Sequence, residues 1–318
     1  MSKTVVTASQ AKSMQSFFGE RLQEDVPMSG YSVIKVGGPA DYLVTVTSSE
    51  ELESAVRFLW EEKIPFLLLG GGSNVLISDA GIREVVLLNQ AKKIEFIDQP
   101  GQVPLLFAES GASLGVVSRR TGAKGWSGLE WASGIPGTIG GAVVNNAGAF
   151  GSNMADNLLL AEILHPSGHR VQRTEWSVDQ FGYDYRTSVI KAGLKPAVVL
   201  SATFQLERST PDEVKEKISE IATKRQASQP GGPSLGSMFK NPPGDYSGRL
   251  IEASGLKGTK VGDVEVSQDH GNFFINQGNA TARDIASLIA LVRDKVNERF
   301  SVELELEIQF IGDWNKEN

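Results

Sequence analysis

The sequence predicts an α+β fold of three units. Three observations predict this fold. The N-terminal part shows a β-α-β pattern, the middle part has β-rich segments separated by glycine-rich loops, and the last part has amphipathic helices followed by a segment of alternating polarity. A chain of 318 residues has the length of two or three domains. We expect units at residues 1–85, including an N-terminal extension over 1–29, at 86–205 and at 206–318.

Composition excludes several classes of function. The 31 Lys and Arg against 38 Asp and Glu give a net charge of −7, so no broad nucleic-acid surface is expected. No apolar run reaches the ~20 residues that span a bilayer, and the N-terminus has no signal-peptide pattern, so we expect a cytoplasmic protein without membrane contact. The chain has no cysteine, which excludes disulfides and thiol catalysis. Three scattered histidines, His165, His169 and His270, do not make a zinc site, so no metal is expected.

A β-α-β arrangement over roughly residues 30–85 predicts the first unit. The stretch of residues 48–66 reads as a helix with Leu52, Val56 and Leu59 on one face. Pro65 leads into a strand over 66–69, and a second strand covers 75–78. Between the two strands the chain reads Gly-Gly-Gly-Ser-Asn.

This glycine stretch, residues 70–74, has two interpretations. Main-chain amides in a glycine loop can converge on a phosphate, because no Cβ blocks the approach. Alternatively, it is a tight hairpin between two strands. It is not the dinucleotide fingerprint, which would need glycine where Val75 stands, and no Gly-Lys-Ser/Thr of a Walker loop is present.

The middle unit combines short β-rich segments with a second glycine cluster. We expect strands within residues 84–89, 93–98, 105–110 and 197–207. Glycines at 134, 137, 140 and 141 follow Trp126 and Trp131. Two glycine loops suit an extended ligand with a central pyrophosphate, such as a dinucleotide; the alternative is a turn-rich core that packs against itself.

The third unit opens and closes with clear periodic patterns. Thr210 and Glu213 form a capping box, with Pro211 in the first turn, for a helix whose apolar residues are Val214, Ile218 and Ile221. Thr281 and Asp284 cap a second helix with the stripe Ile285, Leu288, Ile289, Val292 and Val296. Residues 301–312 alternate as a strand, with Glu303, Glu305, Glu307 and Gln309 on one face, a pattern typical of a solvated face.

One short motif is misleading. Residues 232–236, Gly-Pro-Ser-Leu-Gly, fit the nucleophile elbow of hydrolases. That elbow requires a strand before the serine and a helix after it, whereas a predicted helix and a proline-rich turn precede Ser234. A hydrolase is therefore not expected.

Seven motifs in order resemble one family. They are VGGPADYLV, GGGSNVLIS, GLEWASGIPGTIGGAVVNNAGAFG, YDYRTS, GSMFKNP, GNATARDI and LELEIQFIG, covering about residues 30–312. The chain is similar to UDP-N-acetylenolpyruvoylglucosamine reductases (MurB). The resemblance implies a two-subdomain FAD-binding module of the vanillyl-alcohol-oxidase (PCMH) type and a C-terminal α/β substrate domain. The implied reaction reduces the enolpyruvyl ether of UDP-N-acetylglucosamine to UDP-N-acetylmuramate for peptidoglycan, with NADPH as co-substrate.

The resemblance also implies site residues. It implies non-covalent FAD held at Gly70, Gly71, Gly72, Ser73, Asn74, Ser133, Gly134, Pro136, Gly137, Thr138, Gly140, Gly141, Ala142 and Val199. The implied catalytic residues are Arg186, Ser237 and Glu307, and the implied substrate contacts are Tyr185, Arg225, Lys240 and Asn241. The short connection after Arg186 indicates the class that lacks a tyrosine-bearing loop. Leu306 stands where many relatives have proline.

The residues alone leave these roles open. An arginine fork suits a carboxylate, but Arg186 could instead pack on Tyr185 by a cation–π contact. A loop serine such as Ser237 usually caps a turn, and periodicity assigns Glu307 to solvent. Two other functions remain at this stage: a different flavin oxidoreductase of the same fold, or a nucleotide-binding protein without catalysis. No obligate protein partner is evident.

Overall fold

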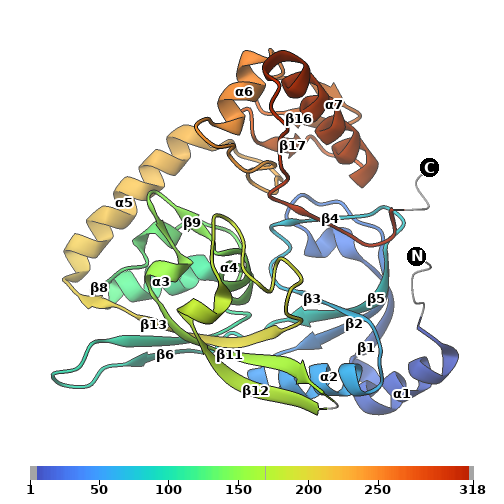
Figure 1. The fold of residues 1–318 in the computed structure, drawn as a ribbon, viewed down its shortest axis with the longest axis vertical. Helices are drawn as coiled ribbons and strands as arrows, with labels where there is room; N and C mark the ends of the chain where they lie inside the picture. Colours follow the sequence, from blue (N-terminus) through green and yellow to red (C-terminus); the bar gives the residue numbers. More distant parts are fainter. Residues whose placement is uncertain (1–5, 169, 315–318) are drawn as a thin grey trace.

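The computed structural model describes residues 6–168 and 170–314. Three lobes are visible, with the N-terminal sheet at lower right, the middle sheet at lower left and the C-terminal unit at the top (Figure 1). The α+β class expected from the sequence is confirmed, because helices and both parallel and antiparallel strand pairs occur in the one chain.

The N-terminal sheet has the strand order β1-β2-β5-β3. Its strands are β1 (Leu22–Pro27), β2 (Pro39–Val46), β5 (Ile82–Asn89) and β3 (Phe66–Leu69). β1 runs antiparallel to β2, whereas β2, β5 and β3 are parallel. Helices α1 (Ala8–Phe18) and α2 (Ser49–Glu61) complete this unit.

Helix α2 forms where the periodicity predicts it. The Ser48 side chain accepts a hydrogen bond from the Glu51 amide at its N-terminus, and Leu52, Val56 and Leu59 are fully buried. The same core includes Val198 and Leu200 of the middle sheet, so α2 packs between the two sheets. Each fully buried aliphatic side chain contributes about 1.5–3 kcal/mol to stability.

The buried Glu109 links the first two units. One of its oxygens accepts from the Ser49 amide at 2.8 Å and the other from the Lys93 amide at 2.7 Å. A buried carboxylate with both oxygens bonded in this way is a strong constraint on the relative position of α2 and the middle sheet.

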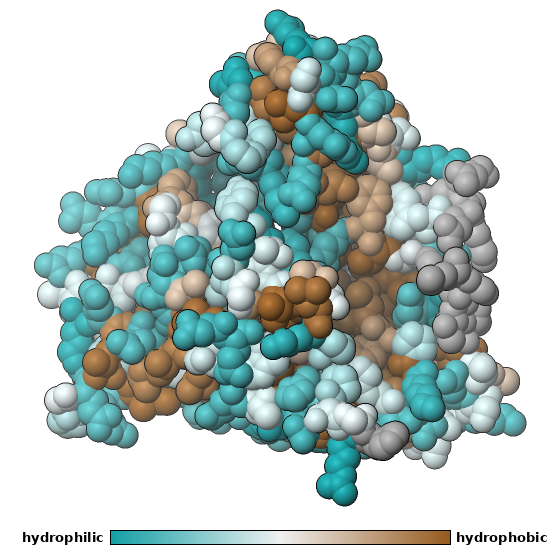
Figure 2. Space-filling model, viewed as in Figure 1, coloured by the Kyte–Doolittle hydropathy of each residue, from teal (hydrophilic) through white to brown (hydrophobic). Residues whose placement is uncertain are grey.

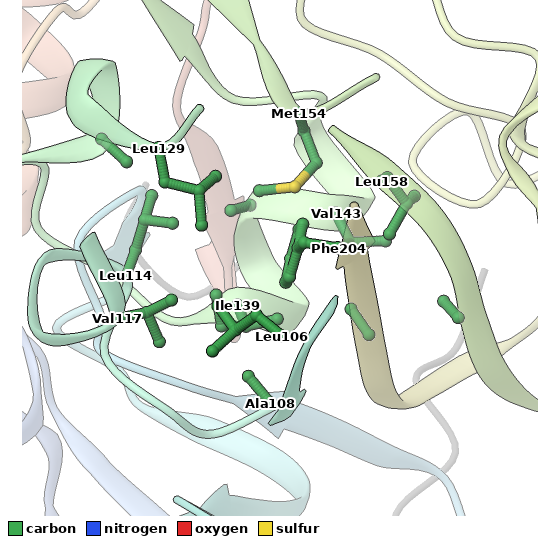
Figure 3. Packing of buried hydrophobic residues seen from close by; sticks show 14 of the residues in the cluster. Leu106, Ala108, Leu114, Val117, Leu129, Ile139, Val143, Met154, Leu158 and Phe204 are labelled. Atoms are coloured by element: carbon green, nitrogen blue, oxygen red, sulfur yellow. The ribbon is translucent and has the colours of Figure 1, made fainter. Parts of the chain in front are cut away.

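The middle sheet has the order β12-β11-β13-β7-β6 and is antiparallel throughout. Its strands are β6 (Ile94–Ile97), β7 (Leu105–Glu109), β11 (Leu158–Ser167), β12 (Arg170–Ser177) and β13 (Val198–Gln205). Helices α3 (Leu114–Ala123) and α4 (Ile139–Asn145) belong to the same unit. Leu106, Ile139, Val143 and Phe204 meet in its core (Figure 3). Short pairs form between β8 (Trp126–Ser127) and β14 (Glu207–Arg208), and between β9 (Gly148–Ala149) and β10 (Ser152–Asn153).

The C-terminal unit has a core of its own. Helices α6 (Ser247–Ala253) and α7 (Ala282–Phe300) pack with a small sheet of β15 (Lys260–Val261), β16 (Val264–Val266) and β17 (Phe274–Asn276). The α7 stripe predicted from the sequence is buried along its length. The capping boxes at Thr210 and Thr281 are both present.

Helix α5 (Pro211–Ser228) connects the middle and C-terminal units (Figure 1). Val214 is buried, and Ile218 lies against Gly122 of α3, where an added Cβ would come within 2.7 Å of its Cδ1. The apolar residues of α5 therefore pack against the middle unit, whereas the sequence predicts that this helix begins the third unit.

Two boundaries differ from the expectation. β5 crosses residue 85, pairs with β2 on both sides of it and pairs with β3 from Val85 onward, so we propose that the first subdomain extends to Asn89. The closing strand is shorter than the alternation predicts, because only β18 (Gln309–Ile311) is a regular strand. It pairs in parallel with β4 (Val75–Ile77). Since β3 pairs with β5 and β4 with β18, the hairpin interpretation of residues 70–74 is wrong.

Within the described ranges, no helix has both the length and the apolar character needed to cross a bilayer.

Asp79 joins the N-terminal unit to the start of α7, and its loss should weaken the fold. Its two oxygens accept from the amides of Ala282 at 2.9 Å and Arg283 at 3.0 Å. We expect Asp79→Ala to lower the free energy of unfolding by about 1 kcal/mol, the usual size of a lost helix cap, in urea denaturation. Glu61→Ala, which removes an exposed carboxylate, is the control. Equal stability of the two variants would contradict this role.

Candidate active site

The two glycine bends pack directly against each other. A Cβ added at Gly71 would lie 3.3 Å from the Gly137 Cα, and one at Gly70 would overlap the Thr138 hydroxyl. The Ser73 hydroxyl donates to the Pro136 carbonyl at 3.2 Å. Absent side chains therefore allow two loops from different units to meet, as close backbone approach requires.

Several main-chain amides stay unpaired at this junction. Within the part of the chain that the structure describes, the amides of Gly71, Gly72, Ser73, Gly137 and Thr138 donate to no protein acceptor. All five residues line the same cavity. Unpaired main-chain amides around a concave surface are suited to phosphate oxygens.

Gly72 is the residue of the bend that tolerates no substitution. Its φ of 61° lies in the left-handed region, and an added Cβ would overlap the Tyr31 carbonyl oxygen. The Gly72 carbonyl also accepts from the Val33 amide at 3.2 Å. A hydrogen-bonded backbone on one side and a cavity on the other fix this position for glycine.

The cavity has a volume of about 1230 Å³ and lies where the three units meet. Its wall includes β3, both glycine bends, the start of β13, the segment after α5 and residues near β18. Hydrophobic residues are visible in the recess between the C-terminal unit and the lower right of the molecule (Figure 2). Large, partly apolar clefts between domains are the usual sites of cofactors.

Most of the predicted cofactor residues line this cavity. They are Gly70, Gly71, Gly72, Ser73, Asn74, Pro136, Gly137, Thr138, Gly140, Gly141, Ala142 and Val199. Ser133 and Gly134 lie outside the wall: Ser133 is buried, and Gly134 lies against the Arg225 side chain. Of the other predicted residues, Arg186, Arg225, Ser237 and Glu307 line the cavity, whereas Tyr185, Lys240 and Asn241 do not.

The loop that carries Arg186 is held by the C-terminal end of α4. The Tyr183 hydroxyl donates to the Val143 carbonyl at 2.8 Å, and the Ser188 hydroxyl donates to the Val144 carbonyl at 2.6 Å. The Asn146 side-chain amide donates in return to the Asp184 carbonyl at 3.1 Å. Carbonyls at a helix end have no partner inside the helix, so these side chains satisfy them and fix the loop together.

Ser237 and Glu307 lie in two extended segments that pair with each other. The Glu307 amide donates to the Met238 carbonyl at 2.9 Å, and the Lys240 amide donates to the Glu305 carbonyl at 2.8 Å. The Asn74 side chain reaches the Glu307 carbonyl at 3.3 Å. The glycine bend is thus bonded directly to the segment that carries the carboxylate.

Glu307 is buried beside positive charge, which corrects the solvated position that the alternation indicates. Its Oε1 lies 3.1 Å from the Arg186 Nε, with 17% of its side chain exposed. Burial raises the pKa of Glu307, and the charges of Arg186, Lys191 and Lys240 partly oppose this rise. The alternation fails because residues 302–308 do not form a regular strand in a two-sided sheet.

Arg225 enters the cavity without a carboxylate partner in the described ranges. Its buried Nε forms no hydrogen bond there, and its guanidinium lies 5.0 Å from the centre of the Phe150 ring. Burial, together with the charge of Arg186, lowers the pKa of Arg225. A half-buried cation next to another cation is unfavourable in the free protein and favours a bound anion.

The three predicted contacts outside the wall have other environments. Lys240 pairs with Glu305 at 3.1 Å, and the Asn241 side chain accepts from the Ser247 amide at 3.1 Å. Tyr185 is 50% exposed, and its ring lies 5.8 Å from the Arg186 guanidinium carbon, so the cation–π contact expected as an alternative for Arg186 is present beside its ion pair.

Sequence reasoning missed Lys191, which also lines the cavity. It follows Arg186 by five residues in an irregular loop, where neither periodicity nor a motif distinguishes one lysine from another.

The described residues contain neither a metal site nor a hydrolase elbow. Within residues 6–168 and 170–314, no cluster of three His, Asp or Glu could hold a metal ion. His169, one of the three histidines, lies outside the described residues. The Ser234 hydroxyl accepts from the Gly236 amide at 3.2 Å, as in a local turn, and the next helix begins only at Ser247.

Comparisons with known proteins identify the family. Residues 226–311 match the model of the UDP-N-acetylenolpyruvoylglucosamine reductase C-terminal domain, and residues 40–173 match an FAD binding domain. The chain is 45% identical over 290 residues to the UDP-N-acetylenolpyruvoylglucosamine reductase of Rubrobacter xylanophilus, with 91% of this chain and 95% of that one covered. The chain belongs to the UDP-N-acetylenolpyruvoylglucosamine reductase (MurB) family.

Two further relatives agree with this assignment. The Staphylococcus aureus reductase is 38% identical, covering 94% of this chain and 95% of that one. The crystal structure of the Thermus caldophilus MurB reductase superposes with a TM-score of 0.76 at 32% identity, covering 92% of this chain and 99% of that one.

Family membership makes this chain an FAD-dependent oxidoreductase. The cavity fits that cofactor, because it combines unpaired amides for a pyrophosphate with the volume that a long ligand needs. Family membership therefore argues against the two alternatives left open by the sequence, which are a nucleotide-binding protein without catalysis and a flavin oxidoreductase of another family.

Gly72→Ala should weaken FAD binding. Gly19→Ala is a matched control, because Gly19 has a φ of 58° against 61° for Gly72 but nothing within 4 Å of an added Cβ. Both variants place a side chain at a positive φ, which is unfavourable, and only Gly72→Ala must also displace the bend because its Cβ meets the Tyr31 carbonyl oxygen. We expect flavin fluorescence titration to give a Kd at least about tenfold higher for Gly72→Ala alone. Equal affinities would contradict the role of this bend.

Proposed function

We propose that this protein reduces UDP-N-acetyl-3-O-(1-carboxyvinyl)glucosamine to UDP-N-acetylmuramate in peptidoglycan precursor synthesis, with NADPH as reductant. One observation carries the proposal: a single cavity combines a junction of unpaired amides with the Arg186–Glu307 pair and Ser237. The first part suits a cofactor pyrophosphate, and the second suits an enolpyruvyl carboxylate and a proton transfer.

The amides of Gly71, Gly72, Ser73, Gly137 and Thr138 would hold the FAD pyrophosphate. Bound FAD would supply the hydride chemistry, which transfers a hydride from NADPH to the enolpyruvyl double bond. The protein's own residues then have two tasks, which are to stabilise the charge that develops next to the carboxylate and to deliver one proton.

Arg186 would bind the substrate carboxylate through its guanidinium fork. This new contact would draw Arg186 away from Glu307 and bring a negative charge close to Glu307. Both changes raise a pKa that burial already raises, so Glu307 would carry its proton in the complex. A neutral Glu307 can donate a hydrogen bond to the carboxylate as its charge increases.

Ser237 would supply the proton to the carbon next to the carboxylate. It is partly buried in the cavity wall and stands in the extended segment that pairs with the Glu307 segment. A serine hydroxyl is a weak acid, so its proton must be replaced through a neighbouring group or water.

The rest of the substrate would bind at the mouth of the cavity. Arg225 has no carboxylate partner in the described ranges and is suited to the diphosphate. We propose Tyr185, Lys240 and Asn241 as contacts outside the wall, where Lys240 would exchange Glu305 for the substrate. Eleven residues separate Arg186 from the start of β13 at Val198, which favours the class without a tyrosine-bearing loop. We also propose a cytoplasmic location and no obligate protein partner.

Stopped-flow absorbance tests the function and the role of Ser237 together. The FAD-loaded protein should lose its yellow colour with NADPH and regain it with the enolpyruvyl substrate. Ser237→Ala should bleach at the normal rate but recolour about 10²–10⁴-fold more slowly, the usual contribution of a proton donor. A colourless protein that refuses FAD would refute the function, whereas equal slowing of both steps would refute only the role of Ser237.

The pH dependence of the second step tests Glu307. If the neutral carboxyl is the active form, the rate constant is constant at low pH and falls as pH rises through the raised pKa of Glu307. Glu307→Gln, which keeps a hydrogen-bond donor but does not titrate, should lack this fall. The measurement is single-turnover flavin reoxidation from about pH 5 to 9. An unchanged profile in Glu307→Gln would contradict this assignment.

A further inference from the structure

Lys191 occupies an unusual position for a loop lysine. It is partly buried in the cavity wall, and its ammonium donates to the Arg186 carbonyl at 3.0 Å. It forms no ion pair within the part of the chain that the structure describes. A loop lysine normally extends its ammonium into water and does not bury it against the protein.

The residue that Lys191 holds is conformationally strained. Arg186 has a φ of 57°, a left-handed conformation that residues with a side chain rarely adopt. The bonds to α4 involve Tyr183, Asp184 and Ser188, so they fix the loop on both sides of Arg186. The ammonium of Lys191 is bonded to residue 186 itself. Strained residues in active sites persist only when such contacts outweigh the strain.

The charges around Lys191 belong to the same site. Glu307 and Glu305 attract its ammonium, whereas Arg186 and Lys240 repel it. Burial and the two cations lower the pKa of Lys191, and the two carboxylates oppose this. In turn, the charge of Lys191 is among those that partly oppose the rise that burial causes in the pKa of Glu307.

We propose that Lys191 is a positioning residue for reduction of the enolpyruvyl group. It holds Arg186 in the left-handed conformation that directs the guanidinium toward Glu307, and it adds positive charge on the side of the cavity where the substrate carboxylate binds. The inference rests on the proposed function for the identity of the substrate. The bond to Arg186 and the charge beside Glu307 are properties of this chain alone.

The test compares three variants of the FAD-loaded full-length protein. Lys191→Met removes the ammonium and keeps most of the stem, and Lys191→Arg restores a cation. Lys195→Met is the control, because Lys195 belongs to the same loop but lies over the Trp176 ring at 5.3 Å and outside the cavity wall.

We expect Lys191→Met to slow flavin reoxidation by the enolpyruvyl substrate about 10- to 100-fold, the range for a small misplacement of a reacting group. Flavin reduction by NADPH and the Kd for FAD should change less than about twofold, and Lys191→Arg should recover part of the loss. The fall of the rate at high pH should move to higher pH, because removing a cation raises the pKa of Glu307. Reoxidation at the wild-type rate, or equal slowing of both half-reactions, would overturn the proposal.

A second measurement does not need turnover. Carbon-13 NMR of glutamate-labelled, FAD-loaded protein, with the Glu307 signal assigned by its loss in Glu307→Gln, follows the titration of this carboxyl. The midpoint should be higher in Lys191→Met than in the wild type and in Lys195→Met. Equal midpoints would overturn the electrostatic part of the proposal. Should the wild type fail to turn over the enolpyruvyl substrate, the proposed function fails, and this comparison still decides whether the charge of Lys191 acts on Glu307.

Discussion

The contact between the two glycine bends is the constraint on which the rest of the site depends. Gly71 and Gly137 approach so closely that an added Cβ would lie 3.3 Å from the opposite Cα, and Ser73 bonds across the junction to Pro136. Chain packing and ligand binding are usually treated as competing explanations for glycine, but here they require each other. Absent side chains bring two loops together, and the same absence leaves amides open toward the cavity between them.

The C-terminal unit is attached to the molecule at this junction. β18 pairs with β4, which begins at the residue after the bend, and the Gln309 amide donates to the Asn74 carbonyl at 3.0 Å. Asp79 caps α7 a few residues later. The position of Glu307 therefore follows from that of the bend. A shift that opens the glycine junction would also move the carboxylate away from Arg186, which is held on the far side by α4.

Local patterns in the sequence predicted local structure well and the site only in part. The stripes of α2 and α7 and the boxes at Thr210 and Thr281 need only neighbouring residues, and all are present. The alternation over 301–312 gave the wrong environment for Glu307, because its neighbours come from residues 238–240 and from Arg186, and no local pattern encodes such distant pairing. The resemblance to the family predicted a catalytic position for Glu307 instead, because a family motif reflects contacts between residues that are distant in the sequence. Neither a local pattern nor a family motif pointed to Lys191. Its ammonium binds a main-chain carbonyl oxygen, and because every residue has such an oxygen, the sequence does not reveal this contact.

The balance of charge in the cavity explains how an acidic protein can recognise anions. The chain carries a net charge of −7, yet Arg186, Lys191 and Arg225 line the cavity, where Glu307 pairs with Arg186 and attracts Lys191. In the free protein these cations repel one another, and burial lowers the pKa of both Lys191 and Arg225. A bound anion removes that repulsion and gains attraction in a region of low dielectric, so the unfavourable free state increases selectivity for negatively charged ligands. The acidic exterior does not oppose this, because its charges are screened within about 8–10 Å at physiological ionic strength, whereas the partly buried charges of the cavity are screened much less.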